Sequence, residues 1–156
     1  MAIEKVKDYF RQFDLEHHIQ EFSVSSATVN EAAQALNIEG KRIAKTLAFR
    51  YFDQTLLIVT AGDAKIDNSK FKAQFNLKAR MLDYDETENS VGHAVGGVCP
   101  FAVNDNCVVV LDVSLQRFET VFPACGSSNS AIELTIDKLV KLSKSTQWVD
   151  VCKEWN

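Results

Sequence analysis

The chain has 156 residues, of which 46 % are hydrophobic and 24 % are charged, enough apolar content for one ordered domain spanning residues 1–156. No long Pro-, Gly- or Ser-rich stretch marks a linker or a disordered tail. With 17 basic and 21 acidic side chains the net charge is -4, which argues against broad binding to duplex DNA but permits a local contact with one end of an RNA.

Two helices are predicted in the first 40 residues. Apolar side chains recur at three- and four-residue steps from Ile3 to Phe13, the pattern of an amphipathic helix with one buried stripe. Thr28 followed by Glu31 is a capping-box pattern, which predicts the start of a second helix, and Gly40 is its expected end.

From Thr46 onward the amino-acid composition becomes typical of β-strands, which predicts a β-hairpin. The segments TLAFRYF and TLLIVTAG are rich in β-branched and apolar residues, and the turn-prone pair Asp53-Gln54 joins them. The next elements expected along the chain are a helix over Asp67–Phe75, a strand over Lys78–Leu82 and a helix over Asp85–Val91.

The C-terminal part adds strands and one helix. The predicted strands are CVVVLDV, TVFPA and AIELT, and the predicted closing helix is Ile136–Leu142. Because strands and helices are interleaved without strict alternation, the pattern favours an α+β or mixed α/β domain built on a mixed, largely antiparallel sheet.

Cysteine usage and hydropathy indicate the compartment. The four cysteines, at positions 99, 107, 125 and 152, form no CxxC pair, and the N-terminal MAIEKVKDYF is amphipathic rather than the apolar core of a secretory signal. No apolar run approaches the roughly 18 to 20 residues that a membrane-spanning helix needs. We therefore expect a cytoplasmic protein with no membrane partner.

The segment VGHAVGGVCPF is a candidate binding loop. Three of the six glycines lie between Gly92 and Gly97, and one of the two prolines follows at Pro100. Glycine permits positive φ and close approach to a ligand, so successive backbone N–H groups can be directed at an oxygen and polarise a carbonyl. The alternative explanation is a tight loop that merely joins a helix to a strand.

Lys45 lies where the predicted helical region gives way to a strand, a position from which a lysine can point into a cleft. With a reference pKa of about 10.4, its ammonium is better suited to anchor a phosphate or a polarised ester than to act as a base. The alternative is a solvated lysine beside Lys41 and Arg42.

His93 and Cys99 belong to the glycine-rich segment. A loop histidine can donate a hydrogen bond or transfer a proton near neutral pH, although a lone histidine is as often packed or exposed. Cys99 can be interpreted as a nucleophile, or with His93 and Cys107 as a metal site. No spacing matches a zinc pattern, however, and a buried thiol is the ordinary use of such a cysteine. We therefore expect no metal and no cofactor.

Pro123 opens the run PACGSSNS, whose small and polar residues are fully explained by turn chemistry. The same small residues would let a flat adenosine or a small amino-acid side chain approach the backbone. Gly126 and Ser127 are therefore further binding candidates, and both explanations stay open.

Several segments, taken together, resemble the YbaK/prolyl-tRNA synthetase-associated family of aminoacyl-tRNA editing domains. They cover the chain from about Thr28 to Leu142, and they are NEAAQALNIEGKRIAKTLAFR, LLIVTAGDAKID, VGHAVGGVCPF, VVVLDVSLQRFETVFPACG and IELTIDKLVKL. The resemblance implies a partly closed barrel flanked by helices. It also implies a trans-acting hydrolase that removes cysteine, alanine or a similar small amino acid from mischarged tRNA, commonly the tRNA for proline. The implied partners are the aminoacylated 3′ end of tRNA and a prolyl-tRNA synthetase.

The resemblance also implies which residues act. The family's functional lysine falls on Lys45, where it engages the terminal nucleotide, and the family's GxxxP loop, whose backbone holds the ester, falls on Gly96–Pro100. An activated water would cleave the bond without a metal. The implied catalytic residues are Lys45, Gly96, Gly97 and Pro100. Together with the candidates above, the substrate-binding set is His93, Val98, Cys99, Thr46, Gly126 and Ser127.

Two departures from the family pattern support other functions. The family's Ser-Gly-Gly-like turn is Ala124-Cys125-Gly126 here, and the acidic residue of the last helix is shifted to Asp137. A non-catalytic module that binds a nucleotide or an aminoacyl-tRNA end fits the altered turn. A small-molecule esterase using Cys99 is a third interpretation, but it needs a base that the sequence does not place.

Overall fold

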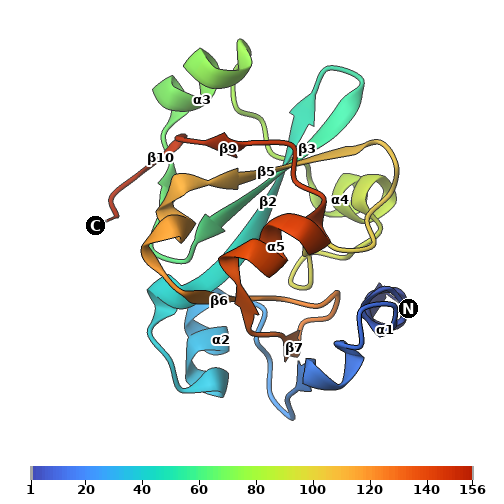
Figure 1. Cartoon of the computed structure of the whole chain (residues 1–156). Coiled ribbons are helices and arrows are strands. Elements are labelled where there is room, and N and C mark those ends of the chain that lie inside the picture. The colour runs from blue at the N-terminus through green and yellow to red at the C-terminus, as the bar shows by residue number, and fades with distance from the viewer. Residues whose placement is uncertain (1, 156) are drawn as a thin grey trace.

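A six-stranded mixed sheet organises the computed structural model, which describes residues 2–155 (Figure 1). In spatial order its strands are β8 (Leu134–Thr135), β6 (Thr120–Pro123), β2 (Ile43–Tyr51), β3 (Gln54–Ala61), β5 (Cys107–Asp112) and β9 (Trp148–Val149). The pairs β8–β6 and β2–β3 are antiparallel, whereas β6–β2, β3–β5 and β5–β9 are parallel. The predicted mixed sheet is confirmed, and its longest ladder is the antiparallel β2–β3 hairpin.

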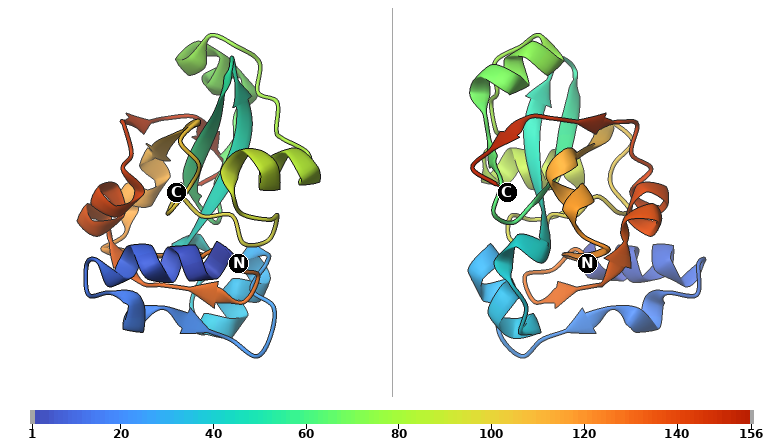
Figure 2. Two further views of the ribbon diagram at one scale, coloured as in Figure 1. Left: turned by 90° about the vertical axis from the view of Figure 1, so that its right-hand side faces the viewer. Right: turned by 60° about the vertical axis from the view of Figure 1, so that its left-hand side comes forward.

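Short strand pairs and helices surround this sheet (Figure 2). The pairs are β1 (Gln20–Glu21) with β7 (Ser130–Ala131), and β4 (Lys65–Ile66) with β10 (Cys152–Lys153). The α-helices are α1 (Ala2–Arg11), α2 (Val29–Leu36), α3 (Asn68–Phe75), α4 (Tyr84–Val91) and α5 (Ile136–Ser143). The 3₁₀-helices are η1 (Glu16–His18), η2 (Gly40–Arg42) and η3 (Val113–Arg117). The described residues form one α+β domain with a curled, half-barrel sheet, which confirms the predicted fold class.

The core is centred on β3, which is buried from its second residue to its last because it has a strand on each side and covered faces. Aromatic contacts attach the helices to this centre. The ring centroids of Phe49 on β2 and Phe71 on α3 lie 5.0 Å apart, and those of Phe10 on α1 and Phe101 lie 4.8 Å apart. Figure 2 shows α1 and the β1–β7 pair together at one end of the sheet and α3 at the other.

The predicted helices are present, with one error at a helix end. Thr28 caps α2 as expected: its hydroxyl accepts the Glu31 N–H at 3.1 Å, and the Glu31 carboxylate accepts the Thr28 N–H at 3.3 Å. The prediction that Gly40 ends this helix is wrong. The helix ends at Leu36 because Asn37 adopts a left-handed conformation with a φ of 57°, and Gly40 begins η2 instead.

The strand predictions are confirmed for the hairpin and corrected elsewhere. Tyr51 pairs with Gln54, so the turn lies one residue earlier than predicted. The strand expected over Lys78–Leu82 is reduced to a single bridge between Phe49 and Met81. The expected AIELT strand is divided between β7 and β8, which pair with different partners.

Candidate functional site

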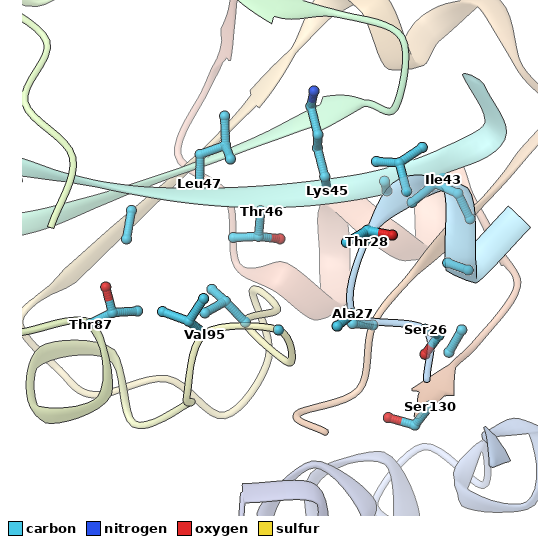
Figure 3. A pocket seen from close by; sticks show the side chains of 18 of the residues that line it. Ser26, Ala27, Thr28, Ile43, Lys45, Thr46, Leu47, Thr87, Val95 and Ser130 are labelled. Carbon is cyan, nitrogen blue, oxygen red and sulfur yellow. The ribbon is translucent and has the colours of Figure 1, made fainter. Parts of the chain in front are cut away.

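A cavity of about 490 Å³ lies along one edge of β2 (Figure 3). Its walls come from the segment around the start of α2, the first half of β2, the start of α4, the glycine-rich loop after α4, and β6 with the turn that follows it. Most of the lining is apolar or small. The lining hydroxyls belong to Ser26, Thr28, Thr46, Tyr84, Thr87 and Ser130, and the charged groups to Lys45 and Asp83.

The wall formed by β2 is the stretch of its edge that lies beyond its short pairing with β6. β2 pairs with β6 only as far as Ala44, and contact resumes where the Leu82 N–H donates to the Ala48 carbonyl at 3.1 Å. That bond shows that even-numbered residues of β2 direct their backbone groups to this edge, since the alternate residues pair with β3. Thr46 therefore presents its N–H and carbonyl to the cavity. Its side-chain hydroxyl is buried and has no hydrogen-bond partner among residues 2–155.

The side chain of Lys45 projects from the face of β2 opposite to that of Thr46, as Figure 3 shows. Successive side chains of a strand alternate between its two faces. The side chain is half-buried, and its Nζ lies 3.5 Å from the Gly62 carbonyl oxygen in the turn after β3. Burial is the main influence on the pKa of this ammonium and lowers it. Lys45 is therefore a lining residue of the cavity whose ammonium is partly desolvated beside the turn after β3, rather than a fully solvated lysine.

The glycine-rich loop forms the wall that faces β2. Gly96 and Val98 line the cavity, and Gly96 has a φ of +98°, a conformation that other residues adopt only with strain. Gly97 is buried, and a Cβ there would lie 2.7 Å from the backbone nitrogen of Ser127. Pro100 is also buried and lines a separate cavity behind the loop. Of these four candidate positions, Gly96 and Val98 therefore line the cavity, whereas Gly97 and Pro100 are buried outside it.

His93 and Cys99 are packed beneath the same loop and do not line the cavity. His93 is 1 % exposed, and its Nε2 lies 2.7 Å from the Phe101 carbonyl oxygen and 3.5 Å from the Cys99 sulfur. Burial raises the pKa of the Cys99 thiol to about 12, so the thiol is neutral at physiological pH. These properties do not suit a nucleophile, which must be an accessible thiolate.

The turn after β6 reaches the cavity through other residues than those expected. Ala124 and Ser130 line the cavity, whereas Gly126 is buried against Ala2 of α1. Ser127 is not a lining residue, but its hydroxyl donates to the hydroxyl of the lining residue Ser130 at 2.7 Å. The hydroxyl that this part of the chain contributes to the cavity therefore comes from Ser130, the first residue of β7.

Sequence reasoning missed the contribution of α4. Asp83 caps this helix by accepting the Glu86 N–H at 2.8 Å, and the Thr87 hydroxyl donates to the Asp83 carbonyl at 2.6 Å. Asp83 and Thr87 line the cavity, as does Thr28, the cap of α2. Two helix N-termini thus border the cavity, and the D-x-x-E spacing at 83–86 was the signal that could have located the second.

This arrangement surrounds an apolar space with backbone groups, hydroxyls and one cation. An apolar space with such groups at its border has the chemistry needed to hold a small ligand that carries a carbonyl or phosphate group. In the part of the chain that the structure describes, no three His, Cys, Asp or Glu side chains gather closely enough to hold a metal ion. Over the same residues, no helix has both the length and the apolar character needed to cross a membrane.

Known proteins are similar to this chain in sequence and in fold. Residues 24–142 match the family described as the aminoacyl-tRNA editing domain. The uncharacterized protein YwhH of Bacillus subtilis (strain 168) is 53 % identical over 156 residues, which is 99 % of each chain. The proline–tRNA ligase of Geobacillus sp. (strain WCH70) is 24 % identical over 102 residues, covering 65 % of this chain and 18 % of the ligase. The crystal structure of a candidate trans-editing enzyme for prolyl tRNA synthetase superposes with a TM-score of 0.87 at 25 % identity, covering 97 % of both chains.

Fold and cavity together define a small α+β domain with a cavity bordered by a sheet edge, a glycine-rich loop and Lys45. The family match covers well over half of the chain. The chain belongs to the aminoacyl-tRNA editing domain family.

Proposed function

We propose that the protein is a trans-acting aminoacyl-tRNA deacylase, a hydrolase that cleaves the ester between a wrongly attached amino acid and the 3′ end of tRNA. The observation that carries this proposal is the cavity of about 490 Å³ between the free edge of β2 and the loop containing Gly96. Family membership and the likeness to a candidate trans-editing enzyme support the same activity.

In this mechanism the site acts by orientation and electrostatics. Backbone groups of the Gly96 loop and of Thr46 hold the ester, with an N–H directed at its carbonyl oxygen, while the Lys45 ammonium engages the terminal nucleotide. A bound water adds to the carbonyl carbon, the bond to the ribose oxygen breaks, and the products are a free amino acid and an intact tRNA 3′-hydroxyl. Because neither Cys99 nor His93 lines the cavity, the mechanism assigns no covalent intermediate to this chain.

We propose a small amino acid such as cysteine or alanine as the group removed, with the tRNA for proline as its carrier. The similarity to part of the proline–tRNA ligases supports that tRNA and makes a prolyl-tRNA synthetase a second candidate partner. The site would then act in the cytoplasm, where tRNA is charged. Size exclusion alone separates substrates that differ by one methylene by only about 1 to 3 kcal/mol, so neighbouring small amino acids should be hydrolysed to a measurable extent.

A second candidate function is a non-catalytic module that binds a nucleotide or the aminoacyl end of tRNA. The turn Ala124-Cys125-Gly126 favours it, because Cys125 is fully buried and none of these three residues brings a hydroxyl to the cavity. The absence of an imidazole or thiolate from the lining of the cavity is consistent with binding as well as with catalysis by orientation.

A deacylation assay over a panel of mischarged tRNAs distinguishes the two functions. We expect turnover by the wild type, and loss of most of it in Lys45→Ala and Gly96→Ala. Lys41→Ala is the matched control, because Lys41 is an exposed neighbour that pairs with Glu39 at 3.5 Å rather than lining the cavity. If no aminoacyl-tRNA is hydrolysed while tRNA still binds, the binding module is the correct function.

A further inference from the structure

Asp83 brings to the cavity a carboxylate that the proposed mechanism does not use. Of the described residues that line the cavity, Asp83 carries the one acidic side chain and Lys45 the one basic side chain. The two belong to different walls, because Lys45 is on β2 and Asp83 directly precedes α4. A ligand with one negative and one positive group would match this pair of charges.

The segment that leads to Asp83 runs along the edge of β2. An antiparallel bridge to β2 forms at Met81, and the Leu82 N–H donates to the Ala48 carbonyl at 3.1 Å. Because the two chains of an antiparallel pair run in opposite directions, the residue after Leu82 is directed toward the start of β2. Asp83 therefore meets the cavity beside the stretch of edge where Thr46 presents its backbone groups.

One oxygen of the Asp83 carboxylate is engaged within the protein and the other is available. Oδ1 accepts the Glu86 N–H at 2.8 Å, the hydrogen bond that caps α4. Among residues 2–155, no hydrogen bond or ion pair reaches Oδ2. The guanidinium of Arg50 on β2 pairs with the Glu86 carboxylate at 2.7 Å rather than with Asp83. Asp83 can therefore accept a hydrogen bond from a ligand and still cap the helix.

The aminoacyl end of tRNA carries one group of each charge. Its terminal nucleotide has a phosphate, and its amino acid has a free α-amino group, which a reference pKa of about 7.7 to 8.0 makes mostly an ammonium at neutral pH. The ester carbonyl lies between these groups and is bonded to the carbon that bears the ammonium. With the ester held by Thr46 and Gly96 and the nucleotide by Lys45, Asp83 is the acidic group in the cavity that can receive the ammonium.

We propose that Asp83 binds the α-ammonium of the aminoacyl group, so that the site selects esters with a free amino group. This assignment rests on the proposed function, since its ligand is the aminoacyl end of tRNA. Esters whose α-nitrogen is acylated, such as peptidyl esters, lack this charge and should be poor ligands. Because Asp83 is exposed, water screens the ion pair, and we expect it to contribute about fivefold in affinity.

The direct test compares the binding of two substrate analogues that have an amide in place of the ester. They are 3′-alanylamino-3′-deoxyadenosine and its lactyl counterpart, which differ only in carrying an ammonium or a hydroxyl. At about pH 6.5, where the amine is protonated, the wild type should bind the alanyl analogue about fivefold more tightly in an NMR titration. Asp83→Asn should lose most of this preference and bind the lactyl analogue as the wild type does. A wild type that binds both analogues equally or neither of them, or a variant that keeps the full preference, would overturn the proposal.

Two features of the variants separate ligand binding from effects on the helix. Asparagine caps helices as well as aspartate does, so Asp83→Asn should keep the hydrogen bond to the Glu86 N–H and the fold. Asp85→Asn is the matched control, because Asp85 is an exposed carboxylate in the first turn of the same helix and does not line the cavity. It should show the preference of the wild type. An equal loss of preference in both variants would assign the effect to the charge of the helix terminus and overturn the role of Asp83.

Single-turnover deacylation tests whether this contact serves hydrolysis. Asp83→Asn should hydrolyse alanyl-tRNA about fivefold more slowly than the wild type and lactyl-tRNA at the wild-type rate. An equal fall on both esters would give Asp83 a structural role and overturn the selection. If the wild type hydrolyses neither ester, the deacylase proposal fails, and the binding of the two analogues still decides whether Asp83 receives the ammonium.

Discussion

The imidazole Nε2 of His93 and the carbonyl oxygen of Phe101 lie 2.7 Å apart, and the hydrogen bond between them joins the two ends of the glycine-rich loop. A carbonyl only accepts, so we assign the proton to Nε2 and leave Nδ1 unprotonated. Nδ1 is buried and has no hydrogen-bond partner among the residues that the structure describes. This contact therefore supports the loop while the imidazole is neutral, and a second proton would have no acceptor.

We predict that acid destabilises the protein through His93. Burial lowers the pKa of His93 in the folded state, so the unfolded chain binds the proton more readily. The associated stability is present above the unfolded pKa of about 6.5 and is lost as the pH falls below it, by up to about 1.4 kcal/mol per pH unit. Urea unfolding between about pH 7.5 and pH 5 measures this loss.

Two variants separate His93 from other sources of pH dependence. His93→Gln keeps a donor for the Phe101 carbonyl and should reduce the slope of unfolding free energy against pH. His17→Gln alters an exposed histidine and should leave that slope unchanged. Equal slopes in His93→Gln and the wild type would assign the acid sensitivity to other groups.

Gly97 and Gly96 should respond differently to a methyl group. In Gly97→Ala the new Cβ would meet three backbone atoms of Ser127 at 2.7 to 2.8 Å, so the loop and the turn must separate. In Gly96→Ala the nearest atom is the Ala27 Cβ at 3.3 Å, and the cost comes mainly from the φ of +98°. We expect a loss of about 1 to 2 kcal/mol for Gly96→Ala and a larger loss for Gly97→Ala. Chemical denaturation of both variants checks this order, and the reverse order would contradict the packing described for Gly97.

Thr46→Val should separate stability from function. The Thr46 hydroxyl is buried without a partner, so its replacement by a methyl group of similar size should leave the free energy of unfolding unchanged or raise it by about 1 kcal/mol. If the hydroxyl serves the substrate, deacylation should fall in the same variant. Thr87→Val is the control, because the Thr87 hydroxyl donates to the Asp83 carbonyl at 2.6 Å and its loss should cost about 1 kcal/mol. Unchanged deacylation by Thr46→Val would remove Thr46 from the substrate-binding residues.

Local signals predicted most of the regular structure, and the errors arose where tertiary contacts decide. The Thr28–Glu31 pattern identified the start of α2, since a capping box is a contact between near neighbours. Gly40 was misread because it begins η2, where its carbonyl oxygen lies against Gly62, a tertiary contact that sequence alone does not show. The helix ends instead at Asn37, a residue that tolerates the left-handed conformation.

The sequence predicted which segments meet at the candidate site, but not which side chains of those segments line it. Lys45, Thr46, Gly96 and Val98 meet at one cavity because β2 and the loop after α4 face each other across it. The direction of each loop residue could not be predicted, since a glycine-rich loop has no fixed periodicity. Cys99 is therefore adjacent to the lining residue Val98 but is itself fully buried.

Cys99 provides the last prediction, that removing its thiol leaves the chemistry intact. Burial raises the pKa of Cys99 to about 12, so almost no thiolate exists at neutral pH, and alkylation by iodoacetamide of the folded protein should be slow at this position. Cys99→Ala should retain deacylation within about twofold, while the void left by the sulfur lowers the unfolding free energy by about 1 to 2 kcal/mol. Cys125→Ala is the matched control, because Cys125 is equally buried and burial also raises the pKa of its thiol. The nucleophile interpretation would be restored if Cys99→Ala abolished deacylation while Cys125→Ala kept both its activity and its Tm. The loop would then have to open for Cys99 to reach the ester.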